Sequence, residues 1–248
     1  MIITTLDFEA TGLDKNKDRI IEAALILYST GQNRILESTG FLIQSDGVPV
    51  TEEITGITGI TQVAVDKFGY APEVALEEVI LYAGQSDAIM AHNGERFDRK
   101  MLENSAQRLG IPLPMRTWVD TMIDIPGVKG EQLITMCAKA GVLMPGAHGA
   151  MVDASSTLEM ARRHSQDPTK SFEKMLERAQ SPLVLIQSHQ ARGNNSDAKK
   201  LRFRWNPERK IWWRAVKEMD MPELVQQAPF DVSRIDKSVT YEMLDTDN

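Results

Sequence analysis

The sequence predicts a mixed α/β fold: a five-stranded sheet of three antiparallel and then two parallel strands, flanked by helices and followed by a small α+β C-terminal module. Three strand-like stretches follow one another in the first 43 residues. From residue 72 onward, amphipathic helices alternate with short buried strands. A hairpin pattern follows residue 182, beyond a break at Asp167-Pro168. These observations predict one domain of ordinary size and one smaller module.

The N-terminal part predicts an antiparallel meander. Ile2–Phe8, Ile20–Tyr28 and Ile35–Ile43 are rich in apolar and β-branched residues. A polar loop separates the first two stretches, and a turn at residues 31–33 joins the second to the third. Short connections of this kind favour neighbouring antiparallel strands.

The middle of the chain predicts helices that alternate with two more strands. Residues 51–65 indicate short helical turns, and Pro72 suits the first turn of a helix. Apolar residues at helical spacing, and stop signals such as Gly110, set the remaining boundaries. The expected elements are helices Glu73–Tyr82, Phe97–Leu109, Gly130–Ala140 and Met151–His164 and strands Asp87–Ala91 and Thr117–Asp120.

The C-terminal region predicts a separate small module. A helix at Ser171–Gln180 and a strand at Leu183–Ile186 precede a hairpin with one apolar and one basic face. The predicted divisions are an α/β domain at 1–166, a linker and helix at 167–182, a basic-aromatic module at 183–230 and a polar tail at 231–248.

Composition narrows the class of protein. The 248 residues are 42% apolar and 25% charged, which is typical of a soluble globular chain. The single cysteine, Cys137, excludes an internal disulfide, and no apolar run approaches the length of a membrane span. The N-terminus runs directly into a strand, so we expect no signal peptide and a cytoplasmic protein.

Charge is unevenly distributed along the chain. The net charge is −7, yet residues 192–217 hold nine Lys or Arg against two acids, so the remainder carries −14. The acidic body argues against a protein that coats nucleic acid by bulk charge. The basic segment indicates a local surface for an anionic partner.

Five residues in three short stretches indicate chemistry when they are taken together. Asp7 and Glu9 leave the same face of the first strand. Asp98 begins a helix, and Asp153 follows His148, which we place in a glycine-flanked loop. Taken singly, they have ordinary explanations: a solvated pair, an anion at a helix N-terminus and a capping histidine. Together, four carboxylates predict two Mg²⁺ or Mn²⁺ ions suited to displacement at phosphorus, with a histidine as general base for water.

Three motifs around these residues resemble those of the DEDDh exonuclease superfamily, which includes the bacterial proofreading subunit, RNase T and oligoribonuclease. The motifs are D-F-E-A-T-G-L at residues 7–13, A-H-N-G-E-R-F-D at 91–98 and A-H-G-A-M-V-D-A at 147–154. G-I-T at 59–61 and D-T at 120–121 also fit the pattern. The resemblance covers about residues 1–163. It implies an RNase H-like sheet and stepwise 3′→5′ release of nucleoside 5′-monophosphates.

The resemblance also implies a role for each residue. Asp7, Glu9 and Asp153 would bind the catalytic metal. Asp7 would also reach the second metal, which Asp98 would hold, and His148 would deprotonate the attacking water. The implied substrate-binding residues are Thr11, Gly12, Leu13, Asn93 and Phe97.

These substrate contacts differ in kind. Thr11 and Gly12 would present backbone groups to the terminal nucleotide, and Leu13 would wedge beside its base. Asn93 and Phe97 would line the same pocket, Phe97 through contact with a base. For Leu13 and Phe97, plain core packing is the alternative.

The C-terminal module admits two interpretations. Basic side chains interleaved with aromatics suit phosphate contacts and base stacking. The candidate nucleic-acid contacts are Arg202, Arg204, Lys210, Trp212 and Arg214. In the alternative, Trp205 and Trp213 form the core of a small domain whose charges simply face water.

The predicted function is a two-metal 3′→5′ exonuclease, with DNA favoured as substrate. An exoribonuclease is the first alternative, because no motif reads a 2′-hydroxyl group. The second is a catalytically idle scaffold that binds nucleic acid. The expected partner is a nucleic acid with a free 3′ end. Proofreading and repair, a polymerase or repair partner, and a homodimer stay open.

Overall fold

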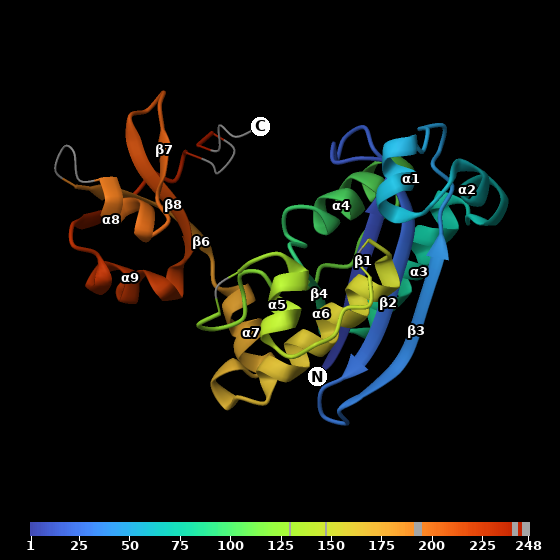
Figure 1. Ribbon diagram of the computed structural model, residues 1–248, viewed down its shortest axis with the longest axis horizontal. Coiled ribbons are helices and arrows are strands. Elements are labelled where there is room, and N and C mark those ends of the chain that lie inside the picture. The colour runs from blue at the N-terminus through green and yellow to red at the C-terminus, as the bar shows by residue number, and fades with distance from the viewer. Residues whose placement is uncertain (129, 147, 191–194, 240–242, 245–248) are drawn as a thin grey trace. The chain divides into compact units, whose positions relative to one another are not determined.

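The computed structural model describes residues 1–128, 130–146, 148–190, 195–239 and 243–244 (Figure 1). The chain divides into two compact units, Met1–Ala179 and Gln180–Asn248. Within the described ranges, no helix is both long and apolar enough to cross a bilayer.

The first unit is built on one sheet, and it confirms the predicted mixed topology. Its strands are β1 (Ile2–Ala10), β2 (Ile20–Ser29), β3 (Arg34–Leu42), β4 (Ala88–Ala91) and β5 (Thr117–Asp120). Their order is β3-β2-β1-β4-β5, with the first three antiparallel and β4 and β5 parallel to β1. The loop over residues 11–19 joins β1 to β2 and a short turn joins β2 to β3, whereas helical segments separate the parallel strands.

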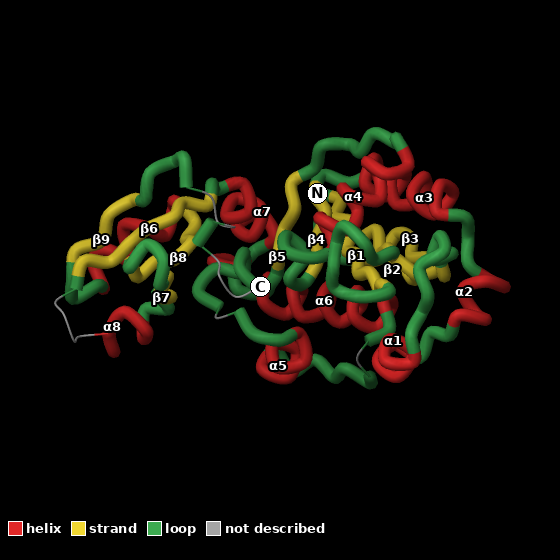
Figure 2. The backbone as a smooth tube through the Cα atoms, turned by 90° about the horizontal axis from the view of Figure 1, so that it is seen from above, coloured by secondary structure: helices red, strands yellow, loops and turns green. Residues whose placement is uncertain are grey.

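Helices cover both faces of this sheet. Figure 2 shows α3 and α4 on one side of the strands and α5 and α6 on the other. The helices of the unit are α1 (Glu52–Thr58), α2 (Gln62–Phe68), α3 (Pro72–Gln85), α4 (Asp98–Leu109), α5 (Leu133–Lys139), α6 (Ala150–Ser165), the 3₁₀ turn η1 (Pro168–Lys170) and α7 (Phe172–Gln180). Each face of the sheet therefore has its own apolar core.

The alternation of side chains along β1 decides which face receives the carboxylates. Leu6 and Phe8 pack in the core beneath α3 and α4. Ile3 packs in the other core, with α5 and α6. Asp7 and Glu9 share the parity of Ile3, so they project from the face that α6 covers.

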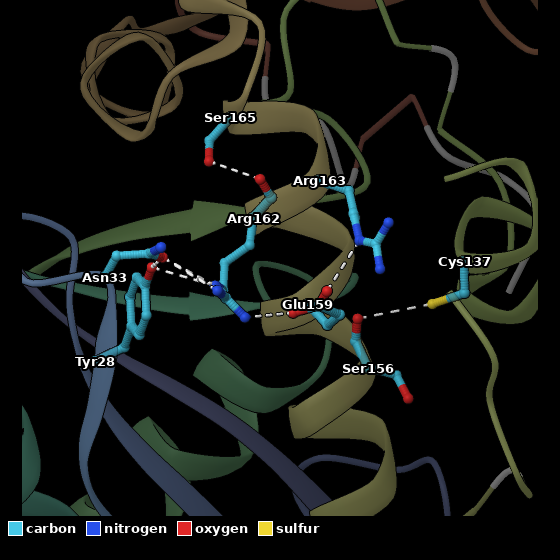
Figure 3. A network of polar contacts seen from close by, with 8 residues as sticks. All are labelled: Tyr28, Asn33, Cys137, Ser156, Glu159, Arg162, Arg163 and Ser165. Atoms are coloured by element: carbon cyan, nitrogen blue, oxygen red, sulfur yellow. Dashed lines mark hydrogen bonds and ion pairs between the residues drawn. The ribbon is translucent and has the colours of Figure 1, made fainter. Parts of the chain in front are cut away.

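Helix α6 is attached to the sheet by polar contacts as well as by its apolar face (Figure 3). The Nε atom of Arg162 donates to the hydroxyl of Tyr28 at 3.2 Å, and its guanidinium lies 5.6 Å from the centre of that ring. Nη2 of Arg162 donates to Asn33 Oδ1 at 3.1 Å. On the opposite side, Cys137 Sγ donates to the carbonyl oxygen of Ser156 at 3.7 Å. The helix is thereby held between β2 and α5.

The second unit has its own four-stranded antiparallel sheet, in the order β7-β8-β6-β9. Its elements are β6 (Leu183–His189), α8 (Asn195–Lys200), β7 (Arg204–Asn206), β8 (Ile211–Lys217), the 3₁₀ turn η2 (Glu218–Asp220), α9 (Met221–Gln227) and β9 (Asp231–Arg234). One face of the sheet packs against α8 and α9. The buried residues of this small core are Ile186, Ala198, Phe203, Val216 and Leu224.

The structure differs from the predicted divisions of the chain at two places. The helix expected within 167–182 is α7, but it belongs to the first unit and not to a linker, because Phe172 and Met175 lie buried in that unit's core. The polar tail predicted at 231–248 contains β9, which pairs with β6. Strand β9 has four residues, D-V-S-R, and so short and polar a stretch cannot be identified as a strand without knowledge of its partner.

The hairpin also differs from prediction in the faces of its tryptophans. Trp205 lies directly opposite Trp212, and Arg204 lies opposite Trp213. Trp205 and Trp212 therefore share one face, and Trp213 is buried on the other. The alternative in which Trp205 and Trp213 together form the core was wrong, because the loop at residues 207–210 sets the register and places them on opposite faces.

Candidate active site

The first part of the site lies at the end of β1. Asp7 and Glu9 are half-buried on the face covered by α6. On β2, Glu22 lies directly opposite Glu9. Glu22 Oε2 accepts a hydrogen bond of 2.9 Å from the backbone N–H of Ala150, the first residue of α6. Strand β2 therefore holds the start of α6 beside the two carboxylates.

The second part of the site is the start of α6 itself. Asp153 lies in its first turn, and His148 precedes the helix with φ of 65°, in the left-handed region. This conformation is uncommon for a residue with a Cβ and is concentrated at functional sites. The backbone N–H of His148 donates to Asp153 Oδ2 at 3.4 Å. Ligand atoms of Glu9, His148 and Asp153 all lie within 4.8 Å of one another.

Asp98 reaches the same strand end from the loop that follows β4. It is the first residue of α4 and is only 3% exposed. Its Oδ1 accepts a hydrogen bond of 3.1 Å from the backbone N–H of Phe8, which lies between Asp7 and Glu9. The structure therefore brings the four carboxylates and the histidine of the three motifs to one end of the sheet.

Crowding and burial make these carboxylates hard to ionise together. Burial raises the pKa of Asp98 to about 8. Burial, and next the charge of Asp153, raise the pKa of Glu9 to about 7. Burial, and next the charge of Asp98, raise the pKa of Asp7 well above its usual range. Burial also raises the pKa of Asp153, although the hydrogen bond from His148 opposes that rise.

These residues fit a divalent metal ion. Asp153 Oδ1 is buried and has no hydrogen-bond partner within the described part of the chain. Carboxylate oxygens are the donors that Mg²⁺ and Mn²⁺ prefer, and bound cations would stabilise the ionised carboxylates, whose pKa values are raised. A cation at this strand end would thus satisfy an orphaned oxygen and relieve repulsion between acids.

The turn after β1 contains three of the predicted substrate-binding residues. Leu13 is 79% exposed, so it does not pack in the core. Thr11 is buried: its hydroxyl donates to Asp18 Oδ1 at 2.9 Å and its N–H to the carbonyl of Arg19 at 2.9 Å. The N–H of Thr11 is therefore committed within the protein. A Cβ at Gly12 would lie 2.8 Å from the carboxylate carbon of Asp18, so a larger residue here would displace that carboxylate.

The loop between β4 and α4 contains the other two predicted substrate-binding residues, Asn93 and Phe97. Asp120 holds this loop through hydrogen bonds to its backbone. Asn93 has φ of 60°, and its N–H donates to Asp120 Oδ1 at 2.8 Å. Asp120 Oδ2 accepts a further hydrogen bond, of 3.3 Å, from Glu95 N–H. Phe97 is partly buried against the core beneath α3 and α4. The buried Asp120 thus holds the loop that leads to Asp98.

Sequence reasoning did not identify Glu22 and Asp120 as parts of the site. A single acid in the apolar run R-I-I-E-A-A was the available signal for Glu22. Asp120 was noted only as part of a D-T pair that fits the family pattern.

The five predicted nucleic-acid contacts of the C-terminal region belong to the second unit. Arg202, Arg204 and Lys210 are exposed, whereas Trp212 and Arg214 are half-buried.

Comparisons with known proteins identify the family to which this chain belongs. A family model described as exonuclease (RNase_T) matches residues 4–161. DNA polymerase III PolC-type of Halalkalibacterium halodurans is 28% identical over 170 residues, which are 66% of this chain and 11% of that protein. The PolC-type polymerase of Listeria innocua is 28% identical over 166 residues, 65% of this chain and 11% of that one. The chain therefore spans about a tenth of the length of these curated relatives.

Solved structures share the fold. The nuclease domain of 3′hExo, a DEDDh family member bound to rAMP, aligns with a TM-score of 0.57 and 22% identity over 67% of this chain and 92% of that one. E. coli exonuclease I in complex with a dA16 oligonucleotide aligns with a TM-score of 0.62 and 15% identity over 93% of this chain and 68% of that one. The expected RNase H-like fold is confirmed.

Proposed function

Because this chain belongs to the exonuclease family, we propose that it is a divalent-metal-dependent 3′→5′ exonuclease that releases nucleoside 5′-monophosphates from DNA. The observation that carries the proposal is the convergence of Asp7, Glu9, Asp98 and Asp153 with His148 at one end of the sheet. No purely structural role explains why a fold would hold four carboxylates together against their mutual repulsion.

The residues of the site would have distinct roles in phosphodiester hydrolysis. Asp7, Glu9 and Asp153 would hold one Mg²⁺ or Mn²⁺ ion, and Asp7 and Asp98 a second. When bound, such ions supply positive charge to the reacting phosphate and to water. A ring nitrogen of the exposed His148 would accept the proton of the attacking water.

The terminal nucleotide would lie over the turn after β1. The exposed side chain of Leu13 suits a wedge beside the terminal base, and Gly12 would present backbone groups to the same nucleotide. Asn93 and Phe97 would line the same pocket from the loop that Asp120 holds.

DNA is the preferred substrate of the proposal, because the curated relatives are DNA polymerases. RNA is the second candidate, supported by the neighbour bound to rAMP. The deciding experiment digests 5′-labelled DNA and RNA strands of equal sequence with Mg²⁺. A ladder of shortened products on DNA is expected. A ladder on RNA alone would transfer the proposal to an exoribonuclease.

Binding without catalysis is the remaining alternative, and it is opposed by the presence of all five residues. It would replace the enzyme proposal if single strands bound tightly and no mononucleotide appeared with Mg²⁺ or Mn²⁺.

The relatives also suggest a setting for the enzyme. Because they are polymerases, we extend the proposal to cytoplasmic proofreading or repair at a DNA 3′ end, beside a polymerase or repair protein. Sedimentation of the purified chain would decide between a monomer and a homodimer.

Replacing Gly12 by Ala should weaken substrate binding. The new Cβ would displace the Asp18 carboxylate, which accepts hydrogen bonds from the Thr11 hydroxyl and from Asp14 N–H. We expect KM to rise about tenfold while kcat stays nearly unchanged, because the turn moves and the carboxylates do not. Gly31→Ala, where nothing lies within 4 Å, is the control in steady-state kinetics. Equal KM values for both variants would contradict this role of the turn.

Glu22 should act as a positioning residue. Glu22→Ala removes the acceptor for the first N–H of α6, so we expect kcat to fall about tenfold with KM unchanged. Glu22→Gln keeps an oxygen at that position and should recover most of the lost activity. Kinetics of the two variants at saturating Mg²⁺ measure the difference. If Gln were as damaging as Ala, the charge of Glu22 and not its hydrogen bond would matter.

A further inference from the structure

Trp205 lies exposed on the surface of the second unit, beside Trp212, which packs against that unit's core. Trp205 and Trp212 face each other across β7 and β8, with ring centres 5.7 Å apart and planes inclined by 51°. Trp205 is 46% exposed, and Trp212 is half-buried. An exposed indole leaves a large flat apolar surface in water, which is costly unless a partner covers it.

Cations surround this pair. The ammonium of Lys199 lies 6.0 Å from the ring centre of Trp212. Arg214 follows Trp212 by two positions on β8, so both side chains leave the same face. Burial, and next the charge of Arg202, lower the pKa of Arg214, which places the two guanidinium groups near each other.

Acidic side chains offset these cations only in part: the negative charge of Asp220 acts on Arg214 and opposes the fall in its pKa. Among the described residues, the ion pairs of this unit do not include Lys199, Arg202 or Arg214. Arg214 donates instead to the carbonyl oxygen of Leu201 at 2.8 Å. Two neighbouring guanidinium groups that face one nearby acid suit an anion with several oxygens, such as a phosphate.

The net positive charge of the surrounding segment also favours an anionic ligand. Residues 195–217 contain eight Lys or Arg and two acids, in a chain whose net charge is −7. An anionic partner is therefore favoured at this surface. The exposed indole of Trp205 distinguishes among anionic partners, because a nucleobase can stack on it and an acidic peptide offers no comparable flat surface.

We propose that the face formed by Lys199, Arg202, Trp205, Trp212 and Arg214, called here the tryptophan face, binds a single-stranded nucleic acid. A base stacks on the exposed indole of Trp205, which Trp212 supports from the core, and the cations contact phosphates. Arg204 projects from the opposite side of the sheet, so it falls outside this surface. The inference rests on the proposed function in taking a nucleic-acid strand as the ligand, but binding requires no hydrolysis.

The test measures binding with the full chain carrying Asp7→Asn, in EDTA, so that the strand is not digested. Labelled oligo(dT) is titrated and followed by anisotropy and by tryptophan fluorescence. Adding Trp205→Leu should weaken binding at least about fivefold and reduce the quenching, without changing Tm. An oligonucleotide with abasic sites should bind the Asp7→Asn protein more weakly than oligo(dT) does.

A matched pair of lysine variants tests how much positive charge contributes to binding. Lys199→Ala should lower the slope of log affinity against log salt by about 0.7, the value for one phosphate on a single strand. Lys237→Ala, an exposed lysine after β9, should leave that slope unchanged.

Equal binding by Trp205→Leu and its parent would overturn the inference. Equal competition by polyglutamate, or self-association lost in Trp205→Leu, would also overturn it and indicate a protein partner or a second copy. An absence of nucleotide release by the wild-type chain would instead refute the proposed function and leave this binding test intact.

Discussion

Replacing Asp7 by Asn should abolish nucleotide release and also make the metal-free protein more stable. Asp7 is half-buried beside other carboxylates, and burial, followed by the charge of Asp98, raises its pKa well above the usual range. An ionised Asp7 therefore opposes folding when no cation is present. Asn has nearly the same shape without the charge. The same substitution removes the carboxylate proposed to serve both metal ions.

The expected loss of kcat is at least about a thousandfold, comparable with the removal of a strong electrostatic contributor to a transition state. Metal-free stability should rise by about 1 kcal/mol or more, which is a gain of about 2–4 °C in Tm for a domain of this size. Release of mononucleotides and thermal denaturation in EDTA measure the two effects.

Asp66→Asn is the matched control, because Asp66 is an exposed acid of the same unit far along the sequence from the three motifs. It should change neither quantity. Activity of Asp7→Asn above a tenth of wild type would exclude Asp7 from catalysis. A lower Tm in EDTA would show that its carboxylate stabilises the fold, contrary to the raised pKa.

The fold was largely predictable because local patterns and tertiary structure agree in the first unit. The meander, the alternating helices and the faces of β1 all follow from the spacing of apolar residues. The second unit was less predictable. Its hairpin register depends on loop geometry, and β9 is recognisable only beside β6.

The site shows the same division between local and long-range information. Asp7, Glu9, Asp98, His148 and Asp153 lie at the ends of elements whose motifs are visible in the sequence. Glu22 and Asp120 act through hydrogen bonds to segments 128 and 27 residues away. No local pattern reports such contacts, because they exist only once the sheet order brings the segments together.

The carboxylates should also make stability depend on pH in opposite ways with and without metal. In the folded, metal-free chain, Glu9 and Asp98 keep their protons up to pKa values of about 7 and about 8. In the unfolded chain they lose them near pH 4. Between these limits the folded state binds more protons than the unfolded state, so the free energy of unfolding falls as pH rises. The stability associated with this difference is complete below about pH 4 and is lost by about pH 8.

Magnesium should reverse that loss, because it binds the ionised carboxylates and competes with protons. Thermal denaturation at pH 5.5 and pH 8, in EDTA and in Mg²⁺, measures the effect. We expect Tm in EDTA to be lower at pH 8 than at pH 5.5. At pH 8, Mg²⁺ at about a hundred times its Kd should add about 2.7 kcal/mol, a rise of roughly 5–10 °C. At pH 5.5 the rise should be much smaller. Asp98→Asn removes one of the two titrating groups, so its Tm in EDTA should depend less on pH. Equal Mg²⁺ effects at both pH values would mean that the ion does not bind at these acids.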